Sequence, residues 1–326
     1  MTKHFESRDV ASTDVESTGA SRRNMLKQLA AGSVALGVAG PSLLLSGCAA
    51  NAQQTPATDD VAANNAVAPL KGRVRHSVAS WTYGHLSIEE LCQLVKSLGF
   101  GAIDLVGPKD WPTLKKHGID CSMCNGAEIN LVDGWCNPQF HPELIKRYLA
   151  HIDLVADAGY TNLICFSGNA RGMDRETALN HAVIGLSQIL PQAEKRGVVL
   201  QMELFNSKVD HPDYLADNSR FGIELCKRLK SNNFKLLYDI YHMQIMEGDI
   251  IRSIQDNHQY FGHYHTAGVP GRHEIDDTQE LYYPAIAKAI VATGFKGYLA
   301  QEFIPTPATP QGKVQSLADA VRICDV

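Results

Sequence analysis

Residues 198–239 read VVLQMEL at 198–204, FGIELCKRLK at 221–230 and FKLLYD at 234–239. Short apolar runs of this length predict buried β-strands, and the spacing of apolar residues in the middle segment predicts a helix that covers them. A strand, a helix and a second strand in succession form the repeating unit of a parallel α/β fold. This stretch therefore predicts an α/β fold with parallel strands, and the segments on both sides repeat the strand–helix unit.

The same unit recurs throughout residues 73–326. We expect strands at 76–81, 102–106, 121–125, 162–167, 198–204, 234–239, 261–266 and 298–303, and helices at 87–99, 111–117, 142–159, 175–196, 221–230, 249–257, 283–293 and 317–323. Eight strand–helix units predict a TIM (β/α)8 barrel, a fold that takes about 250 residues. An open doubly wound sheet is the alternative, but it favours a glycine-rich phosphate turn after the first strand, and SWTYG at 80–84 is not one.

The first 72 residues predict an export leader and a linker. SRRNMLK at 21–27 resembles a twin-arginine signal, a Gly-rich apolar stretch follows at 29–45, and LSGC at 45–48 resembles a lipobox. Residues 1–48 thus predict a lipoprotein signal peptide, and residues 49–72 predict a flexible, disordered linker. We expect export by the twin-arginine route and a lipid anchor at Cys48, in the periplasm or at the cell surface. The alternative is a membrane-anchored N-terminal helix with an incidental cysteine.

The composition narrows the class of protein and its partners. The chain has 326 residues, 44% hydrophobic and 20% charged, with a net charge of −5, which is typical of a globular protein and compatible with a homo-oligomer. Without a long Lys/Arg run after the leader, no nucleic-acid partner is expected, and membrane contact is expected through the lipid anchor only. The seven cysteines other than Cys48 could form one or two disulfides in an exported protein, and the sequence does not assign them. Cys121 and Cys124 have no second pair at zinc-site spacing, so they are expected to be buried thiols rather than zinc ligands.

Four late strands each end near a good metal ligand, namely Glu203, Asp239, His265 and Glu302. Catalysis in a TIM barrel takes place at these strand ends, and all four side chains can face the barrel interior together. Three buried carboxylates would repel one another strongly unless a divalent cation joined them. Oxygen-rich ligands with one imidazole suit Mn²⁺ or Mg²⁺, with Co²⁺ as a further candidate. Alternatively, each residue pairs separately with an Arg or Lys. His263, one layer deeper, is expected to be a hydrogen-bonded core residue.

Three segments carry a family resemblance: YDIYHMQIMEG at 238–248, GHYHTAGVPGRHE at 262–274 and QEF at 301–303. They resemble the hydroxypyruvate isomerases, within the xylose-isomerase-like TIM-barrel superfamily that includes ketose 3-epimerases and endonuclease IV. The resemblance implies that the four ligands above bind the metal, that Glu203 and Glu302 form the acid/base pair, and that His242 and Arg272 contact substrate oxygens. His265 is a departure, because hydroxypyruvate isomerases usually carry Gln there and ketose 3-epimerases carry His.

These observations support more than one function. The first hypothesis is a metal-dependent isomerase of the hydroxypyruvate-isomerase type, which interconverts a small hydroxy-ketone and a hydroxy-aldehyde through an enediolate by proton transfer between the two glutamates. The second is a ketose 3-epimerase or keto-sugar isomerase, and the third is a non-catalytic sugar-binding lipoprotein. A DNA-processing hydrolase is disfavoured by the negative charge. The expected ligand is thus a small keto acid or a sugar, and Trp81 and Trp111 are added as substrate-binding candidates because aromatic rings can stack on a sugar face.

Overall fold

The computed structural model describes residues 69–326, so the predicted signal peptide, the predicted lipidation site Cys48 and most of the predicted linker lie outside the described residues. The strands are β1 (Arg75–Val78), β2 (Ala102–Val106), β3 (Asp120–Cys124), β4 (Asn162–Cys165), β5 (Val199–Glu203), β6 (Phe234–Asp239), β7 (Phe261–Thr266) and β8 (Tyr298–Gln301). The α-helices are α1 (Ile88–Ser97), α2 (Trp111–His117), α3 (His141–Asp157), α4 (Arg175–Leu186), α5 (Leu190–Arg196), α6 (Ser219–Leu229), α7 (Ile240–Met246), α8 (Ile250–Asn257), α9 (Tyr283–Ala292) and α10 (Pro310–Cys324). Three short 3₁₀ helices, η1 (Ser80–Tyr83), η2 (Pro138–Phe140) and η3 (His258–Tyr260), complete the elements of this part.

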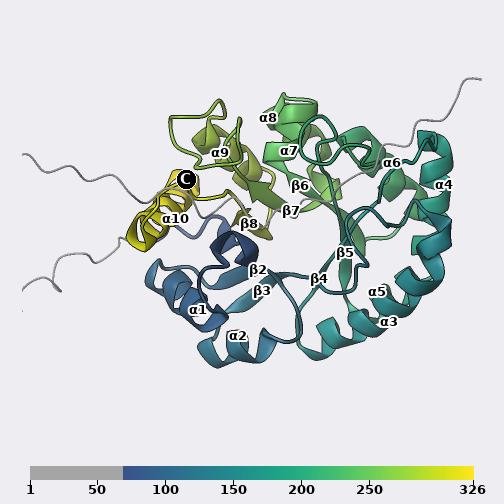
Figure 1. Cartoon of the computed structure of the whole chain (residues 1–326), viewed down its shortest axis with the longest axis horizontal. Coiled ribbons are helices and arrows are strands. Elements are labelled where there is room, and N and C mark those ends of the chain that lie inside the picture. Colours follow the sequence, from purple (N-terminus) through teal and green to yellow (C-terminus); the bar gives the residue numbers. More distant parts are fainter. Residues whose placement is uncertain (1–68) are drawn as a thin grey trace, which may run out of the picture. The chain divides into compact units, whose positions relative to one another are not determined.

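The eight strands form one parallel sheet in the order β1-β8-β7-β6-β5-β4-β3-β2. An isolated parallel bridge between Ala79 and Asp104 joins the two ends of that sheet, so the barrel is nearly closed. The strands lie at the centre and the helices surround them (Figure 1). The predicted TIM barrel is therefore confirmed, and the C-terminal ends of all eight strands meet at one face.

The boundaries differ from the predicted ones where local signals are weak. The first strand ends at Val78, and η1 occupies the residues expected to finish it. The long helix expected at 175–196 is two helices, because Pro191 lies in the first turn of α5 and has no amide hydrogen for a continuous helix. The short helix α7 was not predicted; it starts directly after β6, where Asp239 accepts a hydrogen bond from the backbone of His242 at 3.2 Å. Ser87 begins α1 in a capping box with Glu90, as expected.

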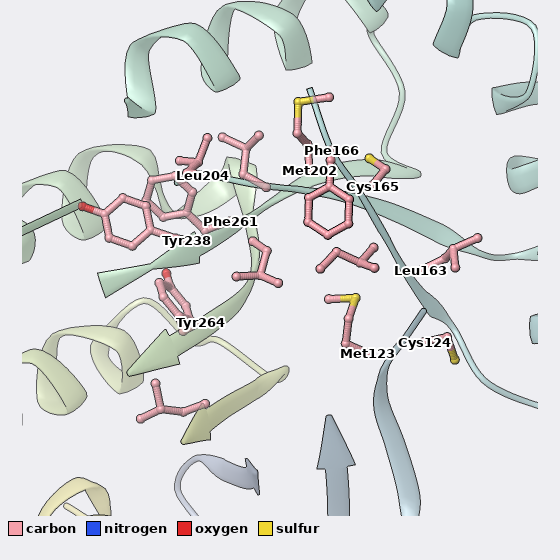
Figure 2. Packing of buried hydrophobic residues seen from close by; sticks show 14 of the residues in the cluster. Met123, Cys124, Leu163, Cys165, Phe166, Met202, Leu204, Tyr238, Phe261 and Tyr264 are labelled. Atoms are coloured by element: carbon pink, nitrogen blue, oxygen red, sulfur yellow. The ribbon is translucent and has the colours of Figure 1, made fainter. Parts of the chain in front are cut away.

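Buried apolar side chains of the strands and helices form one hydrophobic core. Figure 2 shows part of this core, with side chains from β3 to β7 packed together. The ring centroids of Tyr238 and Phe261 are 4.4 Å apart, for example. Burial of each such side chain contributes about 1.5–3 kcal/mol. The seven cysteines within residues 69–326 are buried and unpaired, so none of the disulfides that the sequence left open forms among them, and Cys121 and Cys124 are buried thiols as expected. Among the helices of this range, none is both long and apolar enough to cross a bilayer.

Candidate metal centre and active site

The four predicted ligands come from four neighbouring strands and converge at the C-terminal mouth of the barrel. Glu203 and Asp239 are the last residues of β5 and β6, His265 lies near the end of β7, and Glu302 follows β8 directly. All four are buried, and each offers one ligand atom within 4.8 Å of the others. This separation allows a single ion to contact all four residues. The barrel places them together because adjacent parallel strands end at the same height.

The imidazole of His265 lies at the centre of this cluster. Its Nδ1 atom is 2.9 Å from Glu302 Oε2, 3.2 Å from Glu203 Oε1 and 4.0 Å from Asp239 Oδ2. Glu203 Oε1 is buried without a well-directed hydrogen-bond donor. A buried carboxylate oxygen without a donor is costly, and a divalent cation would satisfy it. The donor set of three carboxylates and one imidazole therefore fits Mn²⁺ or Mg²⁺.

The surroundings of the cluster shift the pKa values of its carboxyl groups in different directions. Burial and the nearby Glu302 raise the pKa of Glu203, although His265 opposes this shift. Burial also raises the pKa of Asp239, to about 8. Burial acts in the same direction on Glu302, but His265 and Arg272 outweigh it and hold the pKa of Glu302 well below its usual range. Groups whose environments push their pKa values apart are typical of acid/base sites.

Arg272 and Trp81 both contact Glu302. The guanidinium Nη2 of Arg272 lies 2.6 Å from Glu302 Oε2 and 3.7 Å from Asp239 Oδ2. The indole N–H of Trp81 donates to Glu302 Oε1 at 2.8 Å, and the Arg272 guanidinium lies 5.2 Å from the Trp81 ring centroid. Arg272 has a φ of +60°, a backbone conformation uncommon for a non-glycine residue, in the loop after β7. These contacts fix the position of Glu302 from two sides.

A cavity of about 280 Å³ opens beside the cluster of the four candidate ligand residues. Its walls combine apolar and aromatic side chains with a few polar groups: Trp81, Leu105, Asn125, Glu128, Leu131, Ile164, Phe166, Glu203, Phe205, His211, Arg272 and Glu302. A larger groove of about 990 Å³ lies against α4 and α6, but its lining includes surface ion pairs such as that of Arg228 with Glu176. The smaller cavity is the candidate substrate site, because it contains both predicted acid/base residues.

Only two of the four predicted substrate-binding residues line the cavity. Arg272 and Trp81 line the cavity. His242 is fully buried: its Nδ1 atom accepts a hydrogen bond from Asn206 at 2.7 Å, and its Nε2 atom lies 3.5 Å from Asp239. Trp111 is also buried, donates its indole N–H to the carbonyl of Val106, and is not among the cavity-lining residues. Trp111 therefore acts as a core residue of α2 in this arrangement.

Two residues near the site were not singled out from the sequence. Asp104 in β2 is fully buried and lies 2.8 Å from Nε2 of His265. A charged residue inside an apolar strand is rare, and this was a signal that sequence reasoning could have used. His211 lines the cavity and stacks on Phe205 with a centroid distance of 4.1 Å, and burial lowers its pKa. His211 lies in the loop after β5, where no periodicity marks it.

Replacement of Trp81 with phenylalanine tests the contact to Glu302. The ring is retained and the N–H donor is removed, so we expect kcat to fall about tenfold with little change in KM. A hydrogen bond to a charged group contributes about 1.5–3 kcal/mol, and Trp81 is 46% exposed, which favours the lower end. Steady-state kinetics of the variant are compared with those of Tyr282→Phe, which alters an exposed ring. An unchanged kcat in Trp81→Phe would show that this hydrogen bond does not orient Glu302 for turnover.

The fold and the site together define a TIM barrel with a cluster of four buried residues that could hold a metal ion at the C-terminal ends of its strands. Residues 92–322 match the model of the xylose isomerase-like TIM barrel family, and the chain belongs to that family. A "2-oxo-tetronate isomerase" of Cupriavidus necator is 34% identical over 37% of this chain, and the match spans 45% of that protein's length. A Drosophila melanogaster protein named "Putative hydroxypyruvate isomerase" is 30% identical, with 69% of this chain and 89% of the relative covered. The D-psicose 3-epimerase structure from Clostridium cellulolyticum H10 has the same fold, with a TM-score of 0.63, 17% identity, and coverage of 77% of this chain and 98% of its own.

Proposed function

We propose that the protein is a metal-dependent isomerase of a small hydroxy-ketone, in which Glu203 and Glu302 exchange a proton with the substrate. The observation that carries this proposal is the convergence of four buried ligand residues beside a cavity that exposes both glutamates. The relatives named hydroxypyruvate isomerase and 2-oxo-tetronate isomerase support the isomerase class. A sugar-binding protein without catalysis would gain nothing from two buried carboxyl groups at its ligand site.

The metal would be held by Glu203, Asp239, His265 and Glu302. When bound, a divalent cation supplies electrostatic stabilisation of the negative charge that develops as a carbon next to a carbonyl loses its proton. One glutamate takes this proton and the other returns one, each acting within hydrogen-bond reach of the substrate. Return to the neighbouring carbon, together with transfer of the hydroxyl proton to the former carbonyl oxygen, gives isomerisation. Return to the same carbon from the opposite face gives epimerisation. Arg272 holds Glu302 in place and offers donors to substrate oxygens.

A ketose 3-epimerase or keto-sugar isomerase is the second candidate, and the charge of the cavity favours it. Three carboxylates and one guanidinium line the cavity, those of Glu128, Glu203, Glu302 and Arg272. A divalent cation adds two positive charges and brings this lining close to neutrality, so the carboxylate of a keto acid would meet no excess positive charge. Arg272 is already ion-paired with Glu302. A neutral sugar needs no such charge, and the aromatic walls suit its apolar face.

Hydrogen exchange with the solvent distinguishes these functions. The protein loaded with Mn²⁺ is incubated in D₂O with hydroxypyruvate, with fructose or with a keto-glycoside, and the products are followed by NMR after removal of the metal. We expect deuterium at a carbon next to the carbonyl. Deuterium together with a moved carbonyl identifies an isomerase, and deuterium with inversion at one carbon identifies an epimerase. If none of the substrates acquires deuterium, the proton-transfer function is wrong and a binding role is favoured.

We further infer that the barrel is exported by the twin-arginine route and held at a membrane by a lipid on Cys48. The twin-arginine segment, the apolar stretch and the lipobox occur in the order that such leaders require. Cell fractionation tests this inference. The full-length protein should collect with membranes and be released by detergent, and Cys48→Ser should lose this association. An unchanged membrane fraction for the Cys48→Ser variant would contradict lipidation at this residue.

A further inference from the structure

Asp104 is a buried carboxylate that is hydrogen-bonded to Ser122 and His265 and lies close to His263. Its Oδ2 atom lies 2.8 Å from Nε2 of His265, and its Oδ1 atom lies 2.9 Å from Nε2 of His263 and 2.6 Å from the hydroxyl of Ser122. The exposed fraction of Asp104, both histidines and Ser122 is zero. A carboxylate in such a place is stable only because donors surround it. Its two oxygens are thereby fixed in orientation.

These contacts tie together strands that are far apart in the chain. Asp104 lies in β2 and Ser122 in β3, whereas His263 and His265 lie in β7. In the sheet order, β3 to β6 lie between β2 and β7. The hydroxyl of Ser122 also bonds to that of Ser77 in β1. β2 is irregular here, because its register with β3 shifts on both sides of Asp104. This irregularity accompanies the inward position of the carboxylate, which crosses the barrel to reach His265.

The contact with Asp104 keeps a proton on Nε2 of His265. A carboxylate only accepts hydrogen bonds, so Nε2 of His265 must be the protonated nitrogen. The other nitrogen, Nδ1, faces Glu203 and Glu302, and only an unprotonated Nδ1 can bind a cation there. We propose that Asp104 is the positioning residue of the metal centre, which holds His265 in the tautomer whose Nδ1 lone pair points to the cation. This proposal rests on the proposed metal site.

Loss of Asp104 would favour the competing tautomer. Without an acceptor at Nε2, His265 can place its proton on Nδ1 and donate it to Glu302 at the present separation of 2.9 Å. That proton would occupy the direction in which the cation binds, so metal binding would require its removal. Carboxylate partners of metal-binding histidines typically change metal affinity 10- to 100-fold when they are removed. Asp104, His263 and His265 could in principle hold a second ion themselves, and the stoichiometry of binding separates the two roles.

Two substitutions and one control test the proposal on the full-length protein. Asp104→Leu keeps the approximate volume and removes the acceptor, whereas Asp104→Asn keeps one acceptor oxygen. Ser122→Ala is the matched control, since it removes a donor from Asp104 and leaves the contact with His265 intact. Mn²⁺ binding is measured by titration with detection of the free ion, and circular dichroism verifies that each variant is folded. The imidazole nitrogens are followed by ¹⁵N NMR in the metal-free and Mg²⁺-loaded states.

We expect one Mn²⁺ per wild-type chain, with affinity reduced about 10- to 100-fold in Asp104→Leu, less in Asp104→Asn and less than about threefold in Ser122→Ala. The His265 Nε2–H signal should appear in both metal states of the wild-type protein and disappear in metal-free Asp104→Leu. Wild-type affinity in a folded Asp104→Leu, or two ions per wild-type chain, would overturn the positioning role alone. If Asp104→Leu fails to fold, a wild-type Nε2 without a proton overturns the role instead. A wild-type chain that binds no Mn²⁺ would overturn the metal site and this role together.

Discussion

Replacement of either Glu203 or Glu302 with glutamine is expected to reduce net conversion of substrate about 10²- to 10⁴-fold, with the metal still bound. Each glutamine keeps an oxygen for the metal but cannot carry a proton between carbon atoms. The expected loss is the usual contribution of a positioned general acid or base. The two residues flank one cavity from β5 and β8, and their pKa values are shifted in opposite directions. Steady-state turnover, with metal content measured by mass spectrometry, gives the result for each variant.

Exchange of substrate hydrogen with D₂O tests separately whether each of the two glutamates transfers a proton. In each single variant the remaining glutamate can still exchange the C–H that faces it, so deuterium should enter one of the two carbonyl compounds even though net conversion is lost. Glu247→Gln is the control, because Glu247 is an exposed carboxyl that accepts a hydrogen bond from Ser219 outside the cavity. Its activity should remain close to that of the wild type. Activity above about a tenth of wild type in a metal-loaded Glu203→Gln or Glu302→Gln would refute proton transfer by that residue.

Removal of the metal with a chelator is expected to lower activity about 10³-fold. Stabilisation of developing negative charge by a bound cation contributes several kcal/mol, and each 1.36 kcal/mol is a factor of ten in rate. The same ion should stabilise the fold, because it joins the carboxylates of Glu203, Asp239 and Glu302, which otherwise depend on His265 and Arg272. At a concentration of 100 times Kd the expected gain is about 2.7 kcal/mol, or roughly 5–10 °C in Tm.

Differential scanning fluorimetry and activity assays on the same metal-free sample measure both effects. Restoration of activity and Tm by Mn²⁺ or Mg²⁺ controls for damage by the chelator. Asp239→Asn removes one ligand charge outside the acid/base pair and should weaken the response to the ion. Full activity in a sample that contains less than about a hundredth of an equivalent of metal would exclude a metal-dependent reaction, since the expected loss on metal removal is about 10³-fold.

The expectations from the sequence succeeded where strand signals were strong. The predicted limits of β6 and β7 agree with the observed ones. β6 is a mostly apolar run, and β7 is rich in aromatic and imidazole side chains. The four ligand positions could be placed at one face because parallel strands in a barrel end together. The start of the barrel was less accurate, since η1 forms where the first strand was expected to continue. Short-range preferences do not distinguish an extended segment from a single 3₁₀ turn of similar composition.

Periodicity in the sequence predicted the barrel, and the rule that parallel strands end at one face predicted which residue types meet at the candidate metal centre. The tertiary structure alone decided which side chains meet across the barrel. Asp104 contacts His265 over a separation of 161 residues, and no local pattern encodes such a contact. The structure likewise placed Trp111 in the core and His211 in the cavity. Loop paths and side-chain directions depend on packing between distant segments, which a sequence pattern does not specify.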